Sequence, residues 1–162
     1  MEMTVRQAPR LKGTVVPPGD KSISLRAVLL NSIATGPAHV SNLCVGDDRS
    51  SILSCMRPLG AEITRYAPCA EHYAEECFHV NGTGPEGMSE PGEVLDAGNS
   101  GTATRLVTGL LAAQSFFSVI SGDRSLRSRP MDRIVGPLTS MGARIMGRGG
   151  DSLAPLAVHG GG

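Results

Sequence analysis

The 162-residue sequence predicts an α+β fold built from two tandem units, each with the element order βαβαββ. Two helix-entry turns repeat at a fixed interval, since Gly98 follows Gly19 by 79 positions and Arg105 follows Arg26 by the same interval. Apolar residues at helical spacing alternate along the chain with short runs that are typical of strands. The 21 glycines and 11 prolines indicate many tight turns between short elements.

The first predicted unit covers residues 17–92. Its opening turn at Gly19 leads into a helix whose apolar part is 27–33. The second helix is expected to end at Gly60, in the left-handed conformation that glycine adopts at helix ends. The other elements expected in this unit are a strand at 38–42, a helix at 50–59, a strand at 61–63 and a closing strand at 78–82.

The second predicted unit, residues 93–162, repeats the same landmarks in the same order. Its opening turn is the glycine-rich segment 98–102, and its second helix is expected to end at Gly142. The elements expected between and after these turns are a helix at 106–113, a strand at 116–120, a helix at 131–141, a strand at 143–145 and a closing strand at 156–160. Residues 1–16 form a separate N-terminal segment.

Composition excludes several classes of function. Fifteen basic and fifteen acidic residues cancel, and aromatic residues make up only 3%, which argues against a nucleic-acid-binding protein. No apolar run approaches the roughly 18 residues of a membrane span, and the N-terminus lacks the apolar core of a signal peptide. We therefore expect a cytoplasmic protein that binds no membrane. Its cysteines are expected to be reduced, namely Cys44, Cys55, Cys69 and Cys77.

The first helix-entry turn has the chemistry of an anion site. Lys21 and Ser22 fall where backbone N–H groups have no partner within the helix, and Arg26 lies one turn further on the same face. A lysine, a hydroxyl, N–H groups and an arginine together can hold a phosphate or a carboxylate. The alternative is an ordinary capped helix with a solvated basic end.

The second half of the chain offers two further candidates. Asn99 and Gly101 lie in a glycine-rich turn before a helix, where N–H groups can approach an anion; the alternative is a flexible connection capped at Ser100 or Thr102. Arg129 lies in an arginine-rich run just before the next helix, and the alternative there is an exposed run of arginines.

Two other clusters are assigned structural roles. One carboxylate of Asp47 and Asp48 is expected to cap the helix that follows. Cys69, His72, Cys77 and His79 do not have a standard zinc-ligand spacing, so we predict no metal site.

Three stretches together carry a family resemblance: 18–26 (PGDKSISLR), 96–105 (DAGNSGTATR) and 122–133 (GDRSLRSRPMDR). In this order and spacing they resemble the enolpyruvyl transferases, and specifically the branch that acts on shikimate 3-phosphate. The branch that acts on UDP-N-acetylglucosamine has Lys-Asn in place of Lys21-Ser22 and a catalytic cysteine loop. The matching region here, 124–129, contains no cysteine.

The resemblance implies the inside-out α/β barrel fold, in which each of two domains contains three βαβαββ units. This chain then holds two of the three units of one domain, and residues 1–16 pair with the second domain. The implied reaction transfers the enolpyruvyl group of phosphoenolpyruvate to the 5-hydroxyl of shikimate 3-phosphate, releases phosphate and leads towards aromatic amino acids. It uses no cofactor.

The resemblance also implies roles for individual residues. Lys21, Gly101 and Arg129 hold phosphoenolpyruvate, while Ser22 and Arg26 hold shikimate 3-phosphate. The matched positions that line the cleft are Asp48, Asn99 and Arg105, with Asn99 counted among the substrate-binding groups, and Lys21 and Asp48 are the candidates for a catalytic role.

The resemblance further suggests glyphosate as an inhibitor, because a methyl group at Gly101 would crowd it. Leu106 replaces a proline common in sensitive members, and Leu25 replaces a histidine or asparagine. The family chain is far longer, so this portion alone is expected to be inactive. The alternative function is a stand-alone anion-binding module that self-associates through an exposed helix face.

Overall fold

The computed structural model describes residues 3–4, 10, 12–67 and 76–161. The first unit begins with a helix, and its three strands form an antiparallel sheet with the strand order β1-β3-β2. Its elements are α1 (Lys21–Ile33), β1 (Thr35–Ser41), α2 (Asp47–Met56), β2 (Glu62–Tyr66) and β3 (Cys77–Thr83).

The second unit forms a four-stranded sheet with the order β4-β5-β7-β6, in which β4 runs parallel to β5 and the other pairs are antiparallel. Its elements are β4 (Leu95–Asp96), α3 (Gly101–Ala112), β5 (Phe117–Ser121), the 3-10 turn η1 (Leu126–Ser128), α4 (Asp132–Ser140), β6 (Arg144–Gly147), α5 (Arg148–Asp151) and β7 (Leu153–His159).

The internal repeat predicted from the sequence is confirmed. In each unit the closing strand lies in the middle of its sheet, because β3 lies between β1 and β2 as β7 lies between β5 and β6. Gly60 and Gly142 have φ values of 100° and 104°, the left-handed conformation expected after the second helix of each unit. Within the described residues, the first unit has no counterpart of β4.

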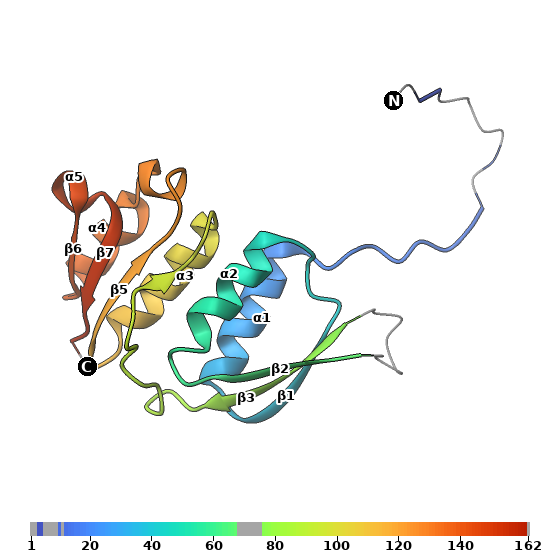
Figure 1. Ribbon diagram of the computed structural model, residues 1–162, viewed down its shortest axis with the longest axis horizontal. Coiled ribbons are helices and arrows are strands. Elements are labelled where there is room, and N and C mark those ends of the chain that lie inside the picture. The colour runs from blue at the N-terminus through green and yellow to red at the C-terminus, as the bar shows by residue number, and fades with distance from the viewer. Residues whose placement is uncertain (1–2, 5–9, 11, 68–75, 162) are drawn as a thin grey trace.

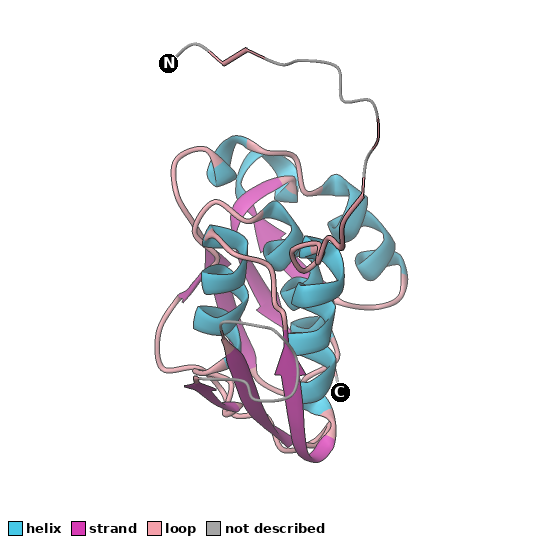
Figure 2. Ribbon diagram, turned by 90° about the vertical axis from the view of Figure 1, so that its right-hand side faces the viewer, coloured by secondary structure: helices cyan, strands magenta, loops and turns pink. Residues whose placement is uncertain are grey.

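The two units pack through their helices. Figure 1 shows α1, α2 and α3 between the two sheets, which lie on the outside. Apolar side chains from these helices join one continuous core, with Val28, Ile52 and Val107 fully buried. Residues 12–20 contain no helix or strand. Residues 12–16 lead away from the packed body in both ribbon views (Figures 1 and 2), whereas Pro17 accepts a hydrogen bond from Asn42 and Gly19 lies against the backbone of Asn42. The pairing of residues 1–16 with a second domain therefore stays a prediction.

The prediction that all four cysteines are reduced is wrong at Cys77, which is disulfide-bonded. Cys44 and Cys55 are free and buried, and Cys69 lies outside the described residues. Composition suggested a redox environment but carries no information on how closely the fold brings two cysteines together.

No helix in the part of the chain that the structure describes is both long enough and apolar enough to cross a membrane. No group of three or more His, Cys, Asp and Glu side chains among the described residues is arranged to hold a metal ion. Cys69 and His72, two of the four residues considered above as zinc ligands, lie outside the described residues.

Candidate functional site

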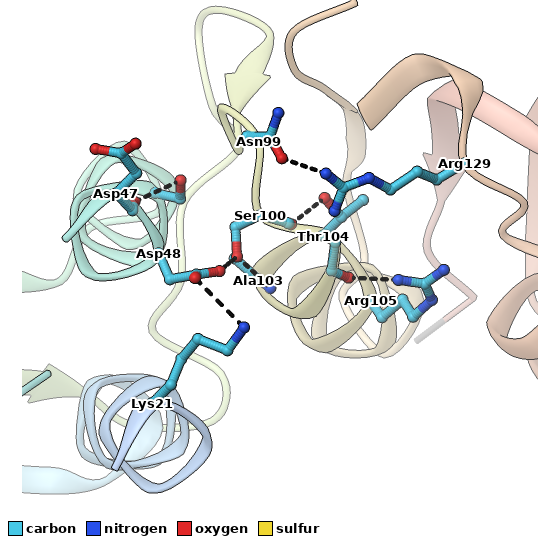
Figure 3. Close-up of polar contacts among 11 residues, drawn as sticks. Lys21, Asp47, Asp48, Asn99, Ser100, Ala103, Thr104, Arg105 and Arg129 are labelled. Atoms are coloured by element: carbon cyan, nitrogen blue, oxygen red, sulfur yellow. Dashed lines mark hydrogen bonds and ion pairs between the residues drawn. The ribbon is translucent and has the colours of Figure 1, made fainter. Parts of the chain in front are cut away.

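Side chains at the N-terminal ends of α1, α2 and α3 contact one another (Figure 3). Each helix terminus carries a partial positive charge and several N–H groups without a partner in the helix. Lys21 begins α1, Asp48 lies in the first turn of α2, and Ser100 is the N-cap of α3. Side chains from three helices therefore face one another where an anion is favoured.

The first turn of α1 has the predicted arrangement. Asp20 is the N-cap, and its carboxylate accepts a hydrogen bond of 2.8 Å from the backbone N–H of Ile23. Arg26 donates back to the carbonyl oxygen of Ser22 over 3.0 Å, so the guanidinium lies beside the hydroxyl-bearing turn. Lys21, Ser22 and Arg26 are all exposed. The turn thus presents two cations and a hydroxyl to solvent.

Asp48 joins the three helix ends. Its Oδ2 lies 3.4 Å from the Nζ of Lys21, and its Oδ1 accepts a hydrogen bond from the hydroxyl of Ser100. The prediction that Asp47 or Asp48 caps α2 is wrong. Gly46 occupies the N-cap position with φ of 119° and no side-chain cap, so Asp48 falls inside the first turn and reaches the neighbouring helices.

Ser100 has two partners. Its hydroxyl oxygen accepts a hydrogen bond of 3.1 Å from the N–H of Ala103, which caps α3, while its proton goes to Asp48. The alternative reading of this turn as a capped helix start is therefore confirmed at Ser100. Ser100 is only 3% exposed, so the cap bond is sheltered from water, while the bond to the partly exposed Asp48 is only partly sheltered.

The turn before α3 also holds Arg129. Asn99 accepts a hydrogen bond from the guanidinium of Arg129 and donates from its Nδ2 to Asp123 over 2.6 Å. The carboxylate of Asp123 accepts from the N–H of Leu126, and this bond, followed by the one from Asn99, lowers the pKa of Asp123. A residue 30 positions from Asn99 is thereby drawn to the start of α3.

Arg105 and Gly101 complete the cluster. The guanidinium of Arg105 donates to the carbonyl oxygens of Gly101 and Pro130 over 2.9 and 2.7 Å. A β-carbon at Gly101 would lie 2.8 Å from Nη1 of Arg105 and 3.5 Å from Nη1 of Arg129. Only a residue without a side chain lets both guanidinium groups lie this close to the first turn of α3.

A hollow of about 350 Å³ adjoins the site and has a different character. Its lining includes the carboxylates of Asp47, Asp96 and Asp123, together with Asn99. None of the predicted cations lines it. An anion is therefore favoured beside the exposed Lys21 and the half-buried Arg129 at the start of α3, and not in this hollow.

The structure brings most of the predicted site residues together. An ion pair and hydrogen bonds join six of them in three pairs, and Ser22 and Arg26 lie beside Lys21 on α1; the pairs are Lys21 with Asp48, Asn99 with Arg129, and Gly101 with Arg105. Leu25 is fully buried, so its side chain packs in the core and does not reach the site. Sequence reasoning missed Asp123, whose only signal in the sequence is that Gly122-Asp123 follows the first predicted strand of the second unit as Gly46-Asp47 follows that of the first.

Comparisons with known proteins agree on one family. The sequence model of the protein family described as EPSP synthase (3-phosphoshikimate 1-carboxyvinyltransferase) matches residues 5–162. Curated 3-phosphoshikimate 1-carboxyvinyltransferases from Pelotomaculum thermopropionicum and Chloroflexus aggregans are 52% and 50% identical over 99% and 98% of this chain. The matched regions are 36% and 35% of those relatives, so the chain spans about a third of their length.

A solved structure is also similar. EPSP synthase from Acinetobacter baumannii superposes with a TM-score of 0.81 and 40% sequence identity. The match covers 92% of this chain and 32% of that one. The arrangement of two repeated units around shared helices is therefore present in a solved member of the same family.

Proposed function

The chain belongs to the EPSP synthase family, and on that premise we propose that it forms one face of the substrate site of a 3-phosphoshikimate 1-carboxyvinyltransferase. The proposed reaction transfers the enolpyruvyl group of phosphoenolpyruvate to the 5-hydroxyl of shikimate 3-phosphate and releases phosphate. It belongs to aromatic amino acid biosynthesis, and we propose the cytoplasm as its location.

The observation that carries this proposal is the meeting of three helix N-termini with four cationic side chains. In the proposed roles, Lys21, Gly101 and Arg129 receive phosphoenolpyruvate, and Ser22 and Arg26 receive shikimate 3-phosphate. Both substrates carry phosphate and carboxylate groups, which guanidinium, ammonium and N–H donors bind with charge-assisted hydrogen bonds. Lys21 and Asp48, whose charged groups lie 3.4 Å apart, are also the candidates for a catalytic role.

We propose that the chain alone binds these substrates weakly and does not turn them over. It spans about a third of the length of its curated relatives, and within the site Lys21, Ser22 and Arg26 are exposed to water. Charge-assisted contacts contribute about 1.5–3 kcal/mol each when sheltered and less when water reaches them. Catalysis needs the closed, dry site that positioning and preorganisation require.

The test is a titration of the chain with each substrate, followed by NMR at the backbone amides of Ser22, Arg26 and Asn99. Lys21→Ala and Arg129→Ala are expected to weaken phosphoenolpyruvate binding about tenfold each, since each removes one charge-assisted contact. Lys12→Ala and Arg133→Ala are matched controls that remove the same charges from exposed positions outside the site. No perturbation of the three amides by either substrate would contradict the proposal.

Two finer proposals accompany it. Glyphosate is proposed to compete with phosphoenolpyruvate beside Gly101, and a displacement titration tests this. Self-association is the competing proposal, because Ile23 and Leu30 are 70% and 57% exposed and lie two turns apart on α1. Gel filtration with light scattering separates self-association from the substrate-binding role proposed above, since a stable dimer favours the self-associating module.

A further inference from the structure

The side-chain amide of Asn99 lies between a carboxylate and a guanidinium. Its Nδ2 donates to Oδ2 of Asp123 over 2.6 Å, and its Oδ1 accepts from Nη2 of Arg129. Figure 3 shows the second contact, with the guanidinium of Arg129 reaching the amide from across the turn. Both ends of one amide are therefore engaged, by partners that follow it in the chain by 24 and 30 positions.

Only one orientation of this amide satisfies both neighbours. If the amide of Asn99 were turned by 180°, its NH₂ group would face the guanidinium of Arg129, donor against donor. Its carbonyl oxygen would then face the carboxylate of Asp123, acceptor against acceptor. The carboxylate thus selects the orientation in which Arg129 finds an acceptor at the start of α3.

Asp123 is itself held firmly enough to exert this selection. Its Oδ1 accepts a hydrogen bond of 2.7 Å from the N–H of Leu126, and its own N–H donates to the carbonyl of Gly98 over 2.9 Å. These bonds fasten the loop that carries Arg129 to the turn that carries Asn99. Asp123 is an unprotonated acceptor at neutral pH, as aspartate ordinarily is, and the hydrogen bond from Leu126, followed by the one from Asn99, lowers its pKa further.

We propose that Asp123 is a positioning residue, which orients the amide of Asn99 and thereby holds Arg129 over the first turn of α3, beside Gly101. The proposal rests on the function proposed above, in which Arg129 receives phosphoenolpyruvate. Nη2 of Arg129 is directed to Asn99 and Ser125, whereas Nη1 faces the first turn of α3. The anion is then met by a guanidinium whose position is already fixed, so less conformational entropy is lost on binding.

The test variant is Asp123→Asn. An asparagine side chain has one acceptor oxygen, which must serve either the N–H of Leu126 or the NH₂ of Asn99, so one donor loses its partner. We expect the dissociation constant for phosphoenolpyruvate to rise about tenfold, while shikimate 3-phosphate binding, read at the amide of Ser22, is unchanged.

The sign of this change separates positioning from simple electrostatics. Removing a carboxylate close to a bound anion should by itself tighten binding, because one repulsion is lost. Unchanged or tighter phosphoenolpyruvate binding by Asp123→Asn would therefore overturn the proposal. Asp132→Asn is the matched control, since it makes the same charge change at an exposed position in the first turn of α4.

A readout without substrate keeps the two proposals distinguishable. In the ligand-free chain, Asp123→Asn is expected to shift the side-chain NH₂ signals of Asn99 and the guanidinium signals of Arg129. If the wild-type chain bound neither substrate, the proposed function would fail, but these signals would still decide the role of Asp123. Signals that do not move would refute it.

A double variant guards against simple misfolding. Combining Asn99→Asp with Asp123→Asn exchanges the two groups, so that an amide at position 123 donates to a carboxylate at position 99. The other carboxylate oxygen there can accept from Arg129, and the net charge equals that of the wild type. We expect the guanidinium signals of Arg129 to recover in the double variant. Failure to recover in a folded double variant would count against the proposal.

Discussion

Replacing Ser100 with alanine tests whether the joint between the helix ends stabilises the protein. Ser100→Ala removes two hydrogen bonds at once, the cap to the N–H of Ala103 and the donation to the carboxylate of Asp48. Loss of a serine N-cap costs about 1 kcal/mol. A hydrogen bond to a charged group contributes about 1.5–3 kcal/mol, but Asp48 is 32% exposed and water partly replaces the serine, so we assign about 1 kcal/mol.

The expected loss in the free energy of unfolding is therefore about 2 kcal/mol, or a decrease of roughly 4–8 °C in the melting temperature. Urea denaturation followed by far-UV circular dichroism measures it. Ser50→Ala is the matched control, because Ser50 is exposed on the neighbouring helix α2 and its replacement should change stability by less than about 0.5 kcal/mol.

A double-mutant cycle with Asp48→Ala isolates the contact between the two units. If the contact acts as described, the coupling free energy between the two substitutions is about 1 kcal/mol. The reasoning is refuted if Ser100→Ala is no more destabilising than Ser50→Ala. A coupling energy of zero would show that the cap alone accounts for the loss.

Three further predictions follow from individual contacts. Gly101→Ala should displace the guanidinium of Arg105 and raise the dissociation constant for phosphoenolpyruvate, measured by titration, about tenfold. Gly109→Ala is the control, because nothing lies near the added carbon. It should leave binding unchanged and raise the free energy of unfolding by about 0.5–1 kcal/mol. The pKa of Asp123 is lower in the folded chain than in the unfolded chain, where it is about 3.9, so the ionised carboxylate stabilises the fold above that pH. This stabilisation is lost as the pH falls through the pKa of the folded state. Denaturation across that range should therefore show the stability gap between wild type and Asp123→Asn narrowing below about pH 4; a constant gap contradicts the assignment. Burial raises the pKa of Cys55 to about 12, so at pH 8 Ellman's reagent should modify it about a thousandfold more slowly in the folded than in the unfolded chain, and equal rates would contradict this.

The order of elements could be read from the sequence because the signals that set it act over a few residues. Helical spacing of apolar side chains predicted the second helix of each unit. Glycine predicted the end of α4 beside Gly142, whereas α2 ends at Met56 and turn residues lead from there to Gly60. The same local reasoning placed Arg26 over Ser22, since residues four apart share a helix face. A repeat of such signals at a fixed interval then predicted the repeated unit.

Local signals failed where a side chain had a choice of partners. Asp48 looked like a helix cap because aspartate commonly caps helices, yet it contacts Lys21 and Ser100 instead. Cys77 looked reduced on composition, yet it is disulfide-bonded. In both cases the outcome depends on which segments the fold brings within a few ångströms.

The sequence by itself determined the repeated unit, the helix-entry turns and the basic and hydroxyl-bearing residues at the start of the helices. Only the tertiary structure decided that Ser100 joins Asp48, 52 positions away, and that Asp123 orients Asn99. The physical reason is range. Backbone conformation responds to neighbours within a turn or two, whereas the partner of a polar side chain is chosen by how the helices of the two units pack against each other.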